Sequence, residues 1–370
     1  MNLQPQRLPV AIIGGGLAGS LLAARLQARQ QPVVLFHQPQ PGTASTAAAG
    51  LANVVTGKGF RLTWQAEQLV TELKRFFEGP AGQSVQHHFH RVPIFRPFRT
   101  TEQANQWAAN AAEDPLAHWV TYYGAPQWPD RVRNPLGGIA VRGTGWANIR
   151  ALVTELHAAF REHPATDLRQ ETFVYTALHP EEKRYNGERF AAVVFADGTG
   201  ALHNCWWPVA PVRPLKGELL ELELPPNFVP PVPIAGGGYV LPLAGERVVV
   251  GSTYEKRFAN ARPTPAGREA LLQTLHRLLH LPGGFAPTVK HHRAGLRPTS
   301  RDRRPLLGAH PCYPGLWFLN GLGTKGLLYA PWLTRLLADN LTGKPTPIPA
   351  AIALQRQAGK DGAPPWPEEA

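Results

Sequence analysis

Apolar residues along the chain follow two patterns, short continuous runs and stripes at three- and four-residue steps. The runs predict β-strands buried on both faces, at residues 10–13, 33–36, 190–196 and 316–319. The stripes predict helices, because they place apolar side chains on one face, at residues 17–26, 64–78, 146–162 and 266–280. Another helix is expected to begin after Ala330, with Pro331 in its first turn and Gly343 as its stop.

A glycine-rich turn separates the first strand from the first helix. Gly14, Gly16 and Gly19 have the G-x-G-x-x-G spacing inside a βαβ pattern. That pattern is typical of a pyrophosphate site, where backbone N–H groups at a helix N-terminus meet the phosphates. A side chain at Gly16 would block the phosphate, and Gly19 lets the helix pack close to the strand. The turn therefore predicts a dinucleotide cofactor, in preference to a glycine turn without a ligand.

One part of this fingerprint is missing. An acidic residue is expected about 20 residues further on, at the end of the second strand, to bind the ribose hydroxyls. That strand ends instead in Phe36, His37 and Gln38, and no acid precedes Glu67. His37 or Gln38 is therefore expected to contact the ribose, and the sequence leaves open which of them does.

Two stretches lack the α/β pattern and indicate a second domain. Residues 85–137 are rich in aromatic, histidine and proline residues, and residues 206–250 combine a proline-rich segment with alternating strands. We expect both to form a β-rich domain inserted between parts of the first. The tail beyond about residue 350 is expected to be mobile because it is short of apolar residues and rich in proline.

Composition limits the cellular location and the kinds of partner that we expect for this protein. The chain carries 38 Lys and Arg against 26 Asp and Glu, a formal charge of +12, which favours anionic ligands. The sequence contains no dense run of Lys and Arg, so a nucleic-acid partner is not favoured. No apolar segment reaches the length of a membrane span. The N-terminus has no signal-peptide pattern, and the two cysteines exclude a disulfide framework. A cytoplasmic location is expected by default.

A second block of motifs lies near the C-terminus. Residues 294–308 read AGLRPTSRDRRPLLG, and residues 320–326, NGLGTKG, precede the run LLYAP. With the N-terminal glycines and the small-residue loop 45–51, the chain resembles the D-amino acid oxidase/glycine oxidase superfamily of FAD-dependent oxidoreductases. The resemblance spans nearly the whole chain and is weakest at residues 85–137.

The resemblance implies an α/β fold with a Rossmann-like FAD-binding domain and a second, β-rich (α+β) substrate domain. The FAD-binding domain is expected at residues 1–84, 138–207 and 295–346, the substrate domain at 85–137 and 208–294, and a tail at 347–370. The resemblance also implies FAD, and we expect it to be held without a covalent bond because no motif for attachment through Cys or His is found. Besides Gly14, Gly16, Gly19 and His37, the expected FAD-binding residues are Ser45, Thr46, Ala49, Gly50, Gly198, Gly321, Gly323, Thr324, Lys325 and Gly326. The N–H groups of Gly321, Gly323 and Gly326 and the following helix dipole are expected at the flavin edge where negative charge develops.

Three residues are candidates for catalysis. By resemblance, Arg297 anchors the carboxylate of the substrate, a role that suits a planar guanidinium; the alternative is an ion pair with Asp302. Lys58, or else Lys325, is a candidate for a cation beside the flavin. The alternative for each is that it is a solvated lysine on the surface. Tyr239 is a candidate wall of the pocket, or a buried aromatic residue on a strand.

The leading function is hydride transfer to FAD from the carbon next to an amine, in an amino acid or N-substituted glycine. An alternative is the tRNA-modifying oxidase that trims carboxymethylaminomethyl-uridine, which the run 321–327 also resembles; a third is a flavin-binding protein without turnover. The histidines at 87, 88, 90, 291 and 292 match no closed zinc pattern, so no metal is expected. The amine side chain, the electron acceptor and the oligomeric state stay open.

Overall fold

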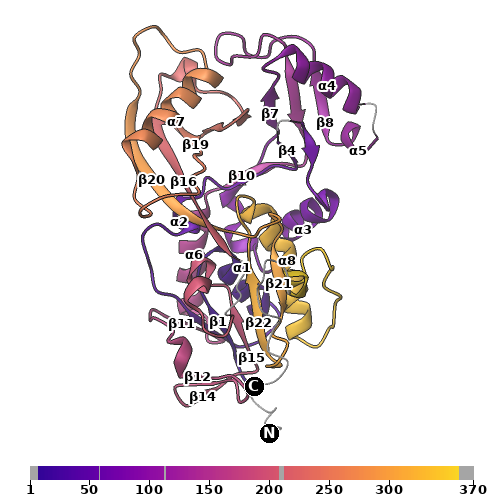
Figure 1. Ribbon diagram of the computed structural model, residues 1–370, viewed down its shortest axis with the longest axis vertical. Coiled ribbons are helices and arrows are strands. Elements are labelled where there is room, and N and C mark those ends of the chain that lie inside the picture. Colours follow the sequence, from indigo (N-terminus) through magenta and orange to yellow (C-terminus); the bar gives the residue numbers. More distant parts are fainter. Residues whose placement is uncertain (1–6, 58, 112–113, 208–211, 358–370) are drawn as a thin grey trace.

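The computed structural model describes residues 7–57, 59–111, 114–207 and 212–357, and two large β-sheets organise them (Figure 1). The first sheet has six strands in the order β11-β2-β1-β15-β22-β21. Their bounds are Thr166–Arg169, Val33–Phe36, Val10–Ile13, Ala192–Phe195, Leu316–Asn320 and Leu306–Ala309. All neighbours pair in parallel except β21, which is antiparallel to β22. This arrangement is the predicted Rossmann-like sheet.

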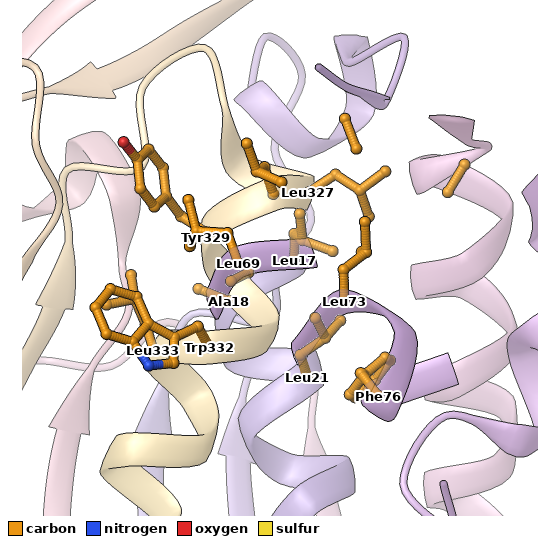
Figure 2. Packing of buried hydrophobic residues seen from close by; sticks show 14 of the residues in the cluster. Leu17, Ala18, Leu21, Leu69, Leu73, Phe76, Leu327, Tyr329, Trp332 and Leu333 are labelled. Atoms are coloured by element: carbon orange, nitrogen blue, oxygen red, sulfur yellow. The ribbon is translucent and has the colours of Figure 1, made fainter. Parts of the chain in front are cut away.

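Both faces of the six-stranded sheet are covered, which explains its continuous apolar strands. Val10 and Ile12 of β1 face one hydrophobic cluster, while Ala11 and Ile13 face another. Most helical residues of the first cluster come from α1 (Leu17–Gln27), α3 (Ala66–Glu78), α6 (Ile149–Glu162) and α8 (Gly326–Leu341). Figure 2 shows α1, α3 and α8 meeting through leucine and aromatic side chains. The small antiparallel sheet β12-β13-β14 (Leu178–His179, Arg184–Tyr185, Glu188–Arg189) adds Tyr185 to the second cluster.

The second large sheet has eight strands in the order β20-β16-β19-β18-β17-β7-β9-β8. Their bounds are Thr288–Thr299, Arg213–Glu223, Arg247–Gly251, Tyr239–Pro242, Ile234–Ala235, Ile94–Pro97, Gly138–Val141 and Val120–Tyr123. Helix α7 (Pro265–Leu278) packs Leu271 and Leu275 against strands β16, β18 and β19. The long pair β16–β20 runs from this sheet down toward the six-stranded one (Figure 1) and therefore brings residues of the two sheets to one site.

Short elements connect these sheets. The remaining helices are α2 (Ala44–Ala47), α4 (Thr101–Ala111) and α5 (Asp114–Ala117), and the remaining strands are β3 (Leu51–Ala52), β4 (Val55–Thr56), β5 (Arg61–Leu62), β6 (Phe89–Arg91) and β10 (Gly145–Ala147). Single 3-10 turns cover Gln83–His88, Tyr175–Ala177, Gly198–His203, Pro226–Phe228 and Leu354–Gln357. No helix of the described segments is long and apolar enough to cross a membrane.

Two predicted helix starts are wrong. Helix α8 begins at Gly326, so Pro331 lies in its second turn and not its first. Proline is tolerated there although it removes one hydrogen bond of the helix, because α8 is buried against α1 and α3. Helix α6 begins three residues later than predicted, since Asn148 caps it by accepting a hydrogen bond from the Ala151 N–H at 3.2 Å.

The expected domain boundaries cut through paired strands. The boundary at residue 138 separates β9 from β7 and β8, although β9 pairs with both in the eight-stranded sheet. The boundary at residue 295 divides β20, which is one continuous strand. Sheet pairing therefore moves both boundaries, because a strand shares the hydrogen bonds of its sheet along its whole length.

The expected mobile tail begins too early. Ile352 and Leu354 are 0% and 1% exposed, and the Leu307 N–H donates to the carbonyl of Ile352 at 2.9 Å. Arg356 forms an ion pair with Asp302 at 3.0 Å. This part of the tail packs on β21, and the rest of the prediction falls outside the described residues.

Candidate active site

A cavity of about 530 Å³ extends from the β1–α1 turn to strands β16, β18 and β20. Its walls come from the turn after β1, helix α2, the end of β15, strand β20 and the first turn of α8. These segments are distant in sequence, and the meeting of the two sheets brings them together. Among the described residues that line the cavity, Arg297 is the only arginine or lysine.

The glycine turn after β1 forms a cradle at one end of this cavity. Gly14 has a φ of +108°, and a Cβ there would collide with the carbonyl of Ala196. A Cβ at Gly16 would lie 3.1 Å from the Ser45 Oγ, which accepts a hydrogen bond from the Leu17 N–H at 3.0 Å. A Cβ at Gly19 would collide with the carbonyl of Gly14, so α1 packs as close to the turn as predicted. The cradle has the form that a pyrophosphate needs.

Histidines line the end of the cavity where the ribose acid is missing. His37 and Gln38 both line it, and a Cβ at Gly15 would lie 2.6 Å from the His37 ring. His157 packs edge-on against His37 at 4.8 Å and bonds the Ser20 Oγ at 3.0 Å. Burial lowers the pKa of His157 to about 4 and also lowers the pKa of His37. Both histidine rings are therefore neutral at pH 7.

Glu171 is an acidic group at this end that sequence reasoning missed. It lies in the loop after β11, and β11 is the parallel neighbour of β2. Because parallel strands end at the same edge of a sheet, Glu171 and His37 both line the cavity. Only the pairing of β11 with β2 reveals that Glu171 lies at this end, because the sequence fingerprint places the ribose-binding acid after β2 itself.

A buried carboxyl follows β15. Asp197 accepts hydrogen bonds from the Tyr175 hydroxyl at 3.1 Å and from the amides of Asn204 and Asn320 at 3.2 Å each. Burial raises the pKa of Asp197 to about 6 against the effect of these donors. This network fixes the loop that carries Gly198, which also lines the cavity.

The expected role of the turn before α8 needs correction. The Gly321 N–H donates to the Asn320 Oδ1 at 2.9 Å, and the Gly323 N–H donates to the carbonyl of Pro298 at 2.9 Å. These two N–H groups are already used inside the protein, so they do not supply the flavin edge. Gly326 and Leu327, in the first turn of the 16-residue α8, both line the cavity. The N–H groups of this turn are therefore the remaining candidates to donate to the flavin edge.

The two candidate lysines differ. Lys58 lies outside the described residues, so its role stays a prediction. Lys325 does not line the cavity; its Nζ donates to the Thr56 Oγ1 at 3.0 Å and to the Thr63 Oγ1 at 2.7 Å. Burial, and then the charge of Arg96, lower the pKa of Lys325 to about 8. It is thus a partly buried, hydrogen-bonded cation and not a solvated surface lysine.

Arg297 lies on β20 at the other end of the cavity. Its Nη1 donates to the carbonyl of Thr253 at 3.2 Å, and its Cζ lies 5.0 Å from the centre of the Tyr254 ring. Asp302 pairs instead with Arg356, so the alternative ion pair with Arg297 is not formed. A Cβ at Gly217, on the paired strand β16, would coincide with the guanidinium of Arg297. Gly217 therefore provides the space that Arg297 occupies.

Tyr239 on β18 is partly buried and forms part of the cavity wall. Its cross-strand partner is Gly251 on β19, where a Cβ would collide with the Tyr239 hydroxyl. Burial raises the pKa of this hydroxyl, so it stays protonated at neutral pH. Two glycines on neighbouring strands thus position two candidate catalytic side chains, a relation that only strand register reveals.

Most of the predicted site residues meet at this one cavity. Those that line it are Gly14, Gly16, His37, Ser45, Ala49, Gly50, Gly198, Tyr239, Arg297, Gly323, Thr324 and Gly326. Gly19, Thr46, Gly321 and Lys325 do not line it. The hydroxyl of Thr46 donates to the carbonyl of Thr43 at 2.9 Å and so stabilises the turn before α2.

The structure also brings an acid to two of the predicted histidines. The Nε2 atoms of His87 and His88 lie 3.2 and 2.8 Å from the Glu155 Oε2. All three ligand atoms lie within 4.8 Å of one another. The spacing of the histidines does not reveal this acid, because Glu155 lies on α6, 67 residues from His88. Two histidine–carboxylate contacts account for the group.

Comparison with known proteins agrees with this geometry. The model of the FAD dependent oxidoreductase family, DAO, matches residues 9–340, and the chain belongs to this family of enzymes. FAD is accordingly its cofactor, and the glycine cradle with Ser45 fits the pyrophosphate of that cofactor.

Individual relatives are glycine oxidases and related enzymes. The chain is 29% identical to glycine oxidase of Pseudomonas putida, covering 95% of this chain and 99% of that protein. It is 25% identical to the tRNA 5-methylaminomethyl-2-thiouridine biosynthesis bifunctional protein MnmC of Marinobacter nauticus, of whose length it spans 58%. The structure of glycine oxidase from Geobacillus kaustophilus has a TM-score of 0.81 at 22% identity and covers 95% of this chain and 99% of its own.

Proposed function

We propose that the enzyme oxidises the C–N bond of a small amino acid or N-substituted glycine. FAD supplies the chemistry by accepting a hydride from the carbon next to the nitrogen. The substrate also loses a proton from nitrogen, and the resulting imine is hydrolysed by water to an amine and a carbonyl product. An electron acceptor then regenerates the cofactor.

One observation carries this proposal: the only cationic side chain among the described residues of the cavity wall is Arg297. A guanidinium held by the Thr253 carbonyl and the Tyr254 ring keeps donors free for a carboxylate. Tyr239 closes the same part of the cavity with a neutral hydroxyl. The arrangement suits a carboxylate-bearing amine, and no acid of the described segments forms an ion pair with Arg297.

Lys325 is the described candidate for a cation that stabilises the reduced cofactor. Its side chain is partly buried and carries no ion pair with any acid among the described residues. Because it does not line the cavity, its charge acts through the first turn of α8 and not by contact with substrate.

An anaerobic screen tests the proposed reaction. The purified protein is expected to be yellow and to lose flavin absorbance on addition of a free amino acid or N-alkyl glycine. The same amines without the carboxylate serve as controls and are expected to react far more slowly. If dithionite bleaches the flavin but no amine in the screen does, the chain is a flavin-binding protein without amine turnover.

A tRNA-modifying oxidase is a second candidate. It is supported by the match to the bifunctional MnmC protein and by the formal charge of +12. A tRNA carrying carboxymethylaminomethyl-uridine, compared with the unmodified tRNA and with free N-alkyl glycines, separates the two candidates. Faster bleaching by the modified tRNA than by any free amine would favour this second reading.

A further inference from the structure

A second cavity of about 330 Å³ adjoins the substrate end of the first. The two cavities share Tyr239 and Tyr254 as wall residues. The second lies between the segment Asn53–Phe60, the stretch from Arg96 to Gln103, and the β17–β18 turn. The second cavity thus lies on the other side of the two tyrosines that border the substrate end.

Two arginines and no acid line this second cavity, among the residues described there. Arg96 is 8% exposed, and its guanidinium donates to the carbonyls of Val55 and Gly57 at 2.7 Å each. It also stacks on Phe60 at 4.5 Å. These contacts use two of its five N–H donors, so the group is positioned and still able to donate.

Arg99 is the more adaptable of the two. Its side chain is exposed, and its Nη1 lies 3.5 Å from the carbonyl of Gly236. A Cβ at Gly237 would approach the same Nη1 to 2.8 Å, so the glycine turn leaves space for the guanidinium. Arg99 therefore lies at the rim, free to close on a ligand.

Lys325 adds a third positive charge behind this wall. It is held by Thr56, which lines the second cavity, and its pKa responds to the charge of Arg96. Neither Arg96, Arg99 nor Lys325 has an ion pair with a carboxylate among the described residues. A buried cation without a counter-charge, such as Arg96, is costly, and an anion in the cavity would offset that cost.

We propose that this second cavity is a subsite for an anionic group on the nitrogen substituent of the substrate. The substrate class is an N-substituted glycine with a second carboxylate at the far end of its substituent. One carboxylate binds Arg297 in the first cavity, and the other binds Arg96 and Arg99 in the second. This inference rests on the proposed amine oxidation and names the substrate class for it.

Matched amines test the subsite in the FAD-loaded enzyme. N-(carboxyalkyl)glycines of increasing chain length are compared with their carbamoyl analogues, which have nearly the same shape but no charge. We expect flavin reduction by the best carboxylate to exceed that of its amide by about tenfold or more, as charge-assisted hydrogen bonds imply. Arg99→Gln should remove most of this preference and leave reduction by N-ethylglycine near the wild-type rate.

Arg189→Gln is the control for net charge, because Arg189 is exposed on β14 and lines neither cavity. It should keep the preference. Arg96→Gln is a second variant, with retained FAD absorbance as its folding check. Equal rates for acid and amide in the wild type, or a preference that survives both Arg99→Gln and Arg96→Gln, would overturn the subsite.

Binding without turnover separates this inference from the proposed function. Glutarate and its monoamide contain no amine, and their binding is measured by calorimetry on the oxidised enzyme. Tighter binding of glutarate that is lost in Arg99→Gln would support the subsite even if no amine reduced the flavin. Reduction by N-ethylglycine with no discrimination in either assay would keep the amine oxidation and reject the subsite.

Discussion

The two ends of the large cavity are built for anions by opposite means. The cofactor end has no lysine or arginine among its described wall residues and presents a glycine turn and the N-terminus of α1. The substrate end presents Arg297, with Arg96 and Arg99 in the adjoining cavity. Backbone N–H groups suit a pyrophosphate that stays bound, whereas a guanidinium suits a carboxylate that must be oriented and released.

This difference between the two ends also explains why the cofactor end can be predicted from sequence and the substrate end cannot. A backbone cradle needs glycines at fixed spacing within one turn, so Gly14 and Gly16 can be predicted from sequence. A side-chain site needs residues from several strands in one register.

Gly16→Val is expected to abolish FAD binding. A β-branched side chain would occupy the phosphate space beside Ser45, where a Cβ alone already lies 3.1 Å from the hydroxyl. The purified variant should be colourless and should take up no FAD in a titration. Far-UV circular dichroism checks that both sheets still fold. Stoichiometric FAD in this variant would show that the cradle is not the cofactor site.

Arg297→Ala is expected to keep FAD and to slow reduction by carboxylate-bearing amines. Loss of a charge-assisted bidentate contact costs about 2–4 kcal/mol in transition-state binding, or about 30- to 1000-fold in the second-order rate. Rapid-mixing measurement of flavin bleaching gives this rate. Amines without a carboxylate are the control and should be little affected. An unchanged rate for every substrate would give Arg297 a structural role only.

Gly217→Ala tests whether strand register positions the anchor. The new methyl group would take the place of the Arg297 guanidinium, which is the flexible end of its side chain and can move aside. We expect FAD binding and thermal stability to stay near wild type while reduction slows by about tenfold, the equivalent of ~1.4 kcal/mol. Gly283→Ala is the control for adding a methyl group, because nothing lies within 4 Å of the added Cβ and the φ of Gly283 is not in the left-handed region. A normal rate in Gly217→Ala would mean that Arg297 has another productive position.

The sequence predicts much of the fold and one half of the site. Residues 10–36 carry strand, glycine turn, helix and strand in one local pattern, and β1, α1 and β2 form as expected. Helix α8 shows the limit, because burial against α1 and α3 overrides the proline that was expected in its first turn. The start of a buried helix depends on contacts that no local signal records.

The substrate end could not be predicted because its relations are cross-strand. Arg297 was found by its motif, but Gly217 is 80 residues away in sequence and becomes its neighbour only through the β16–β20 register. Tyr254 and Arg96 were missed, since they belong to separate segments with no motif. Glu171 was missed because the cofactor-end acid follows β11 and not β2.

His157→Gln probes the smallest effect, beside His37 at the cofactor end. Burial holds the pKa of His157 at about 4 in the folded state against about 6.5 in the unfolded chain. Between these values the unfolded state binds more protons, so stability is full above about pH 6.5 and falls as the pH drops toward 4. Glutamine stays neutral and can still reach the Ser20 hydroxyl. With saturating FAD, the loss in unfolding free energy from pH 7 to pH 5 should shrink by about 1–2 kcal/mol in the variant. Urea unfolding at the two pH values measures this, with the surface variant His179→Gln as control. An equal loss in His157→Gln and wild type would show that the cofactor end owes no acid sensitivity to this histidine.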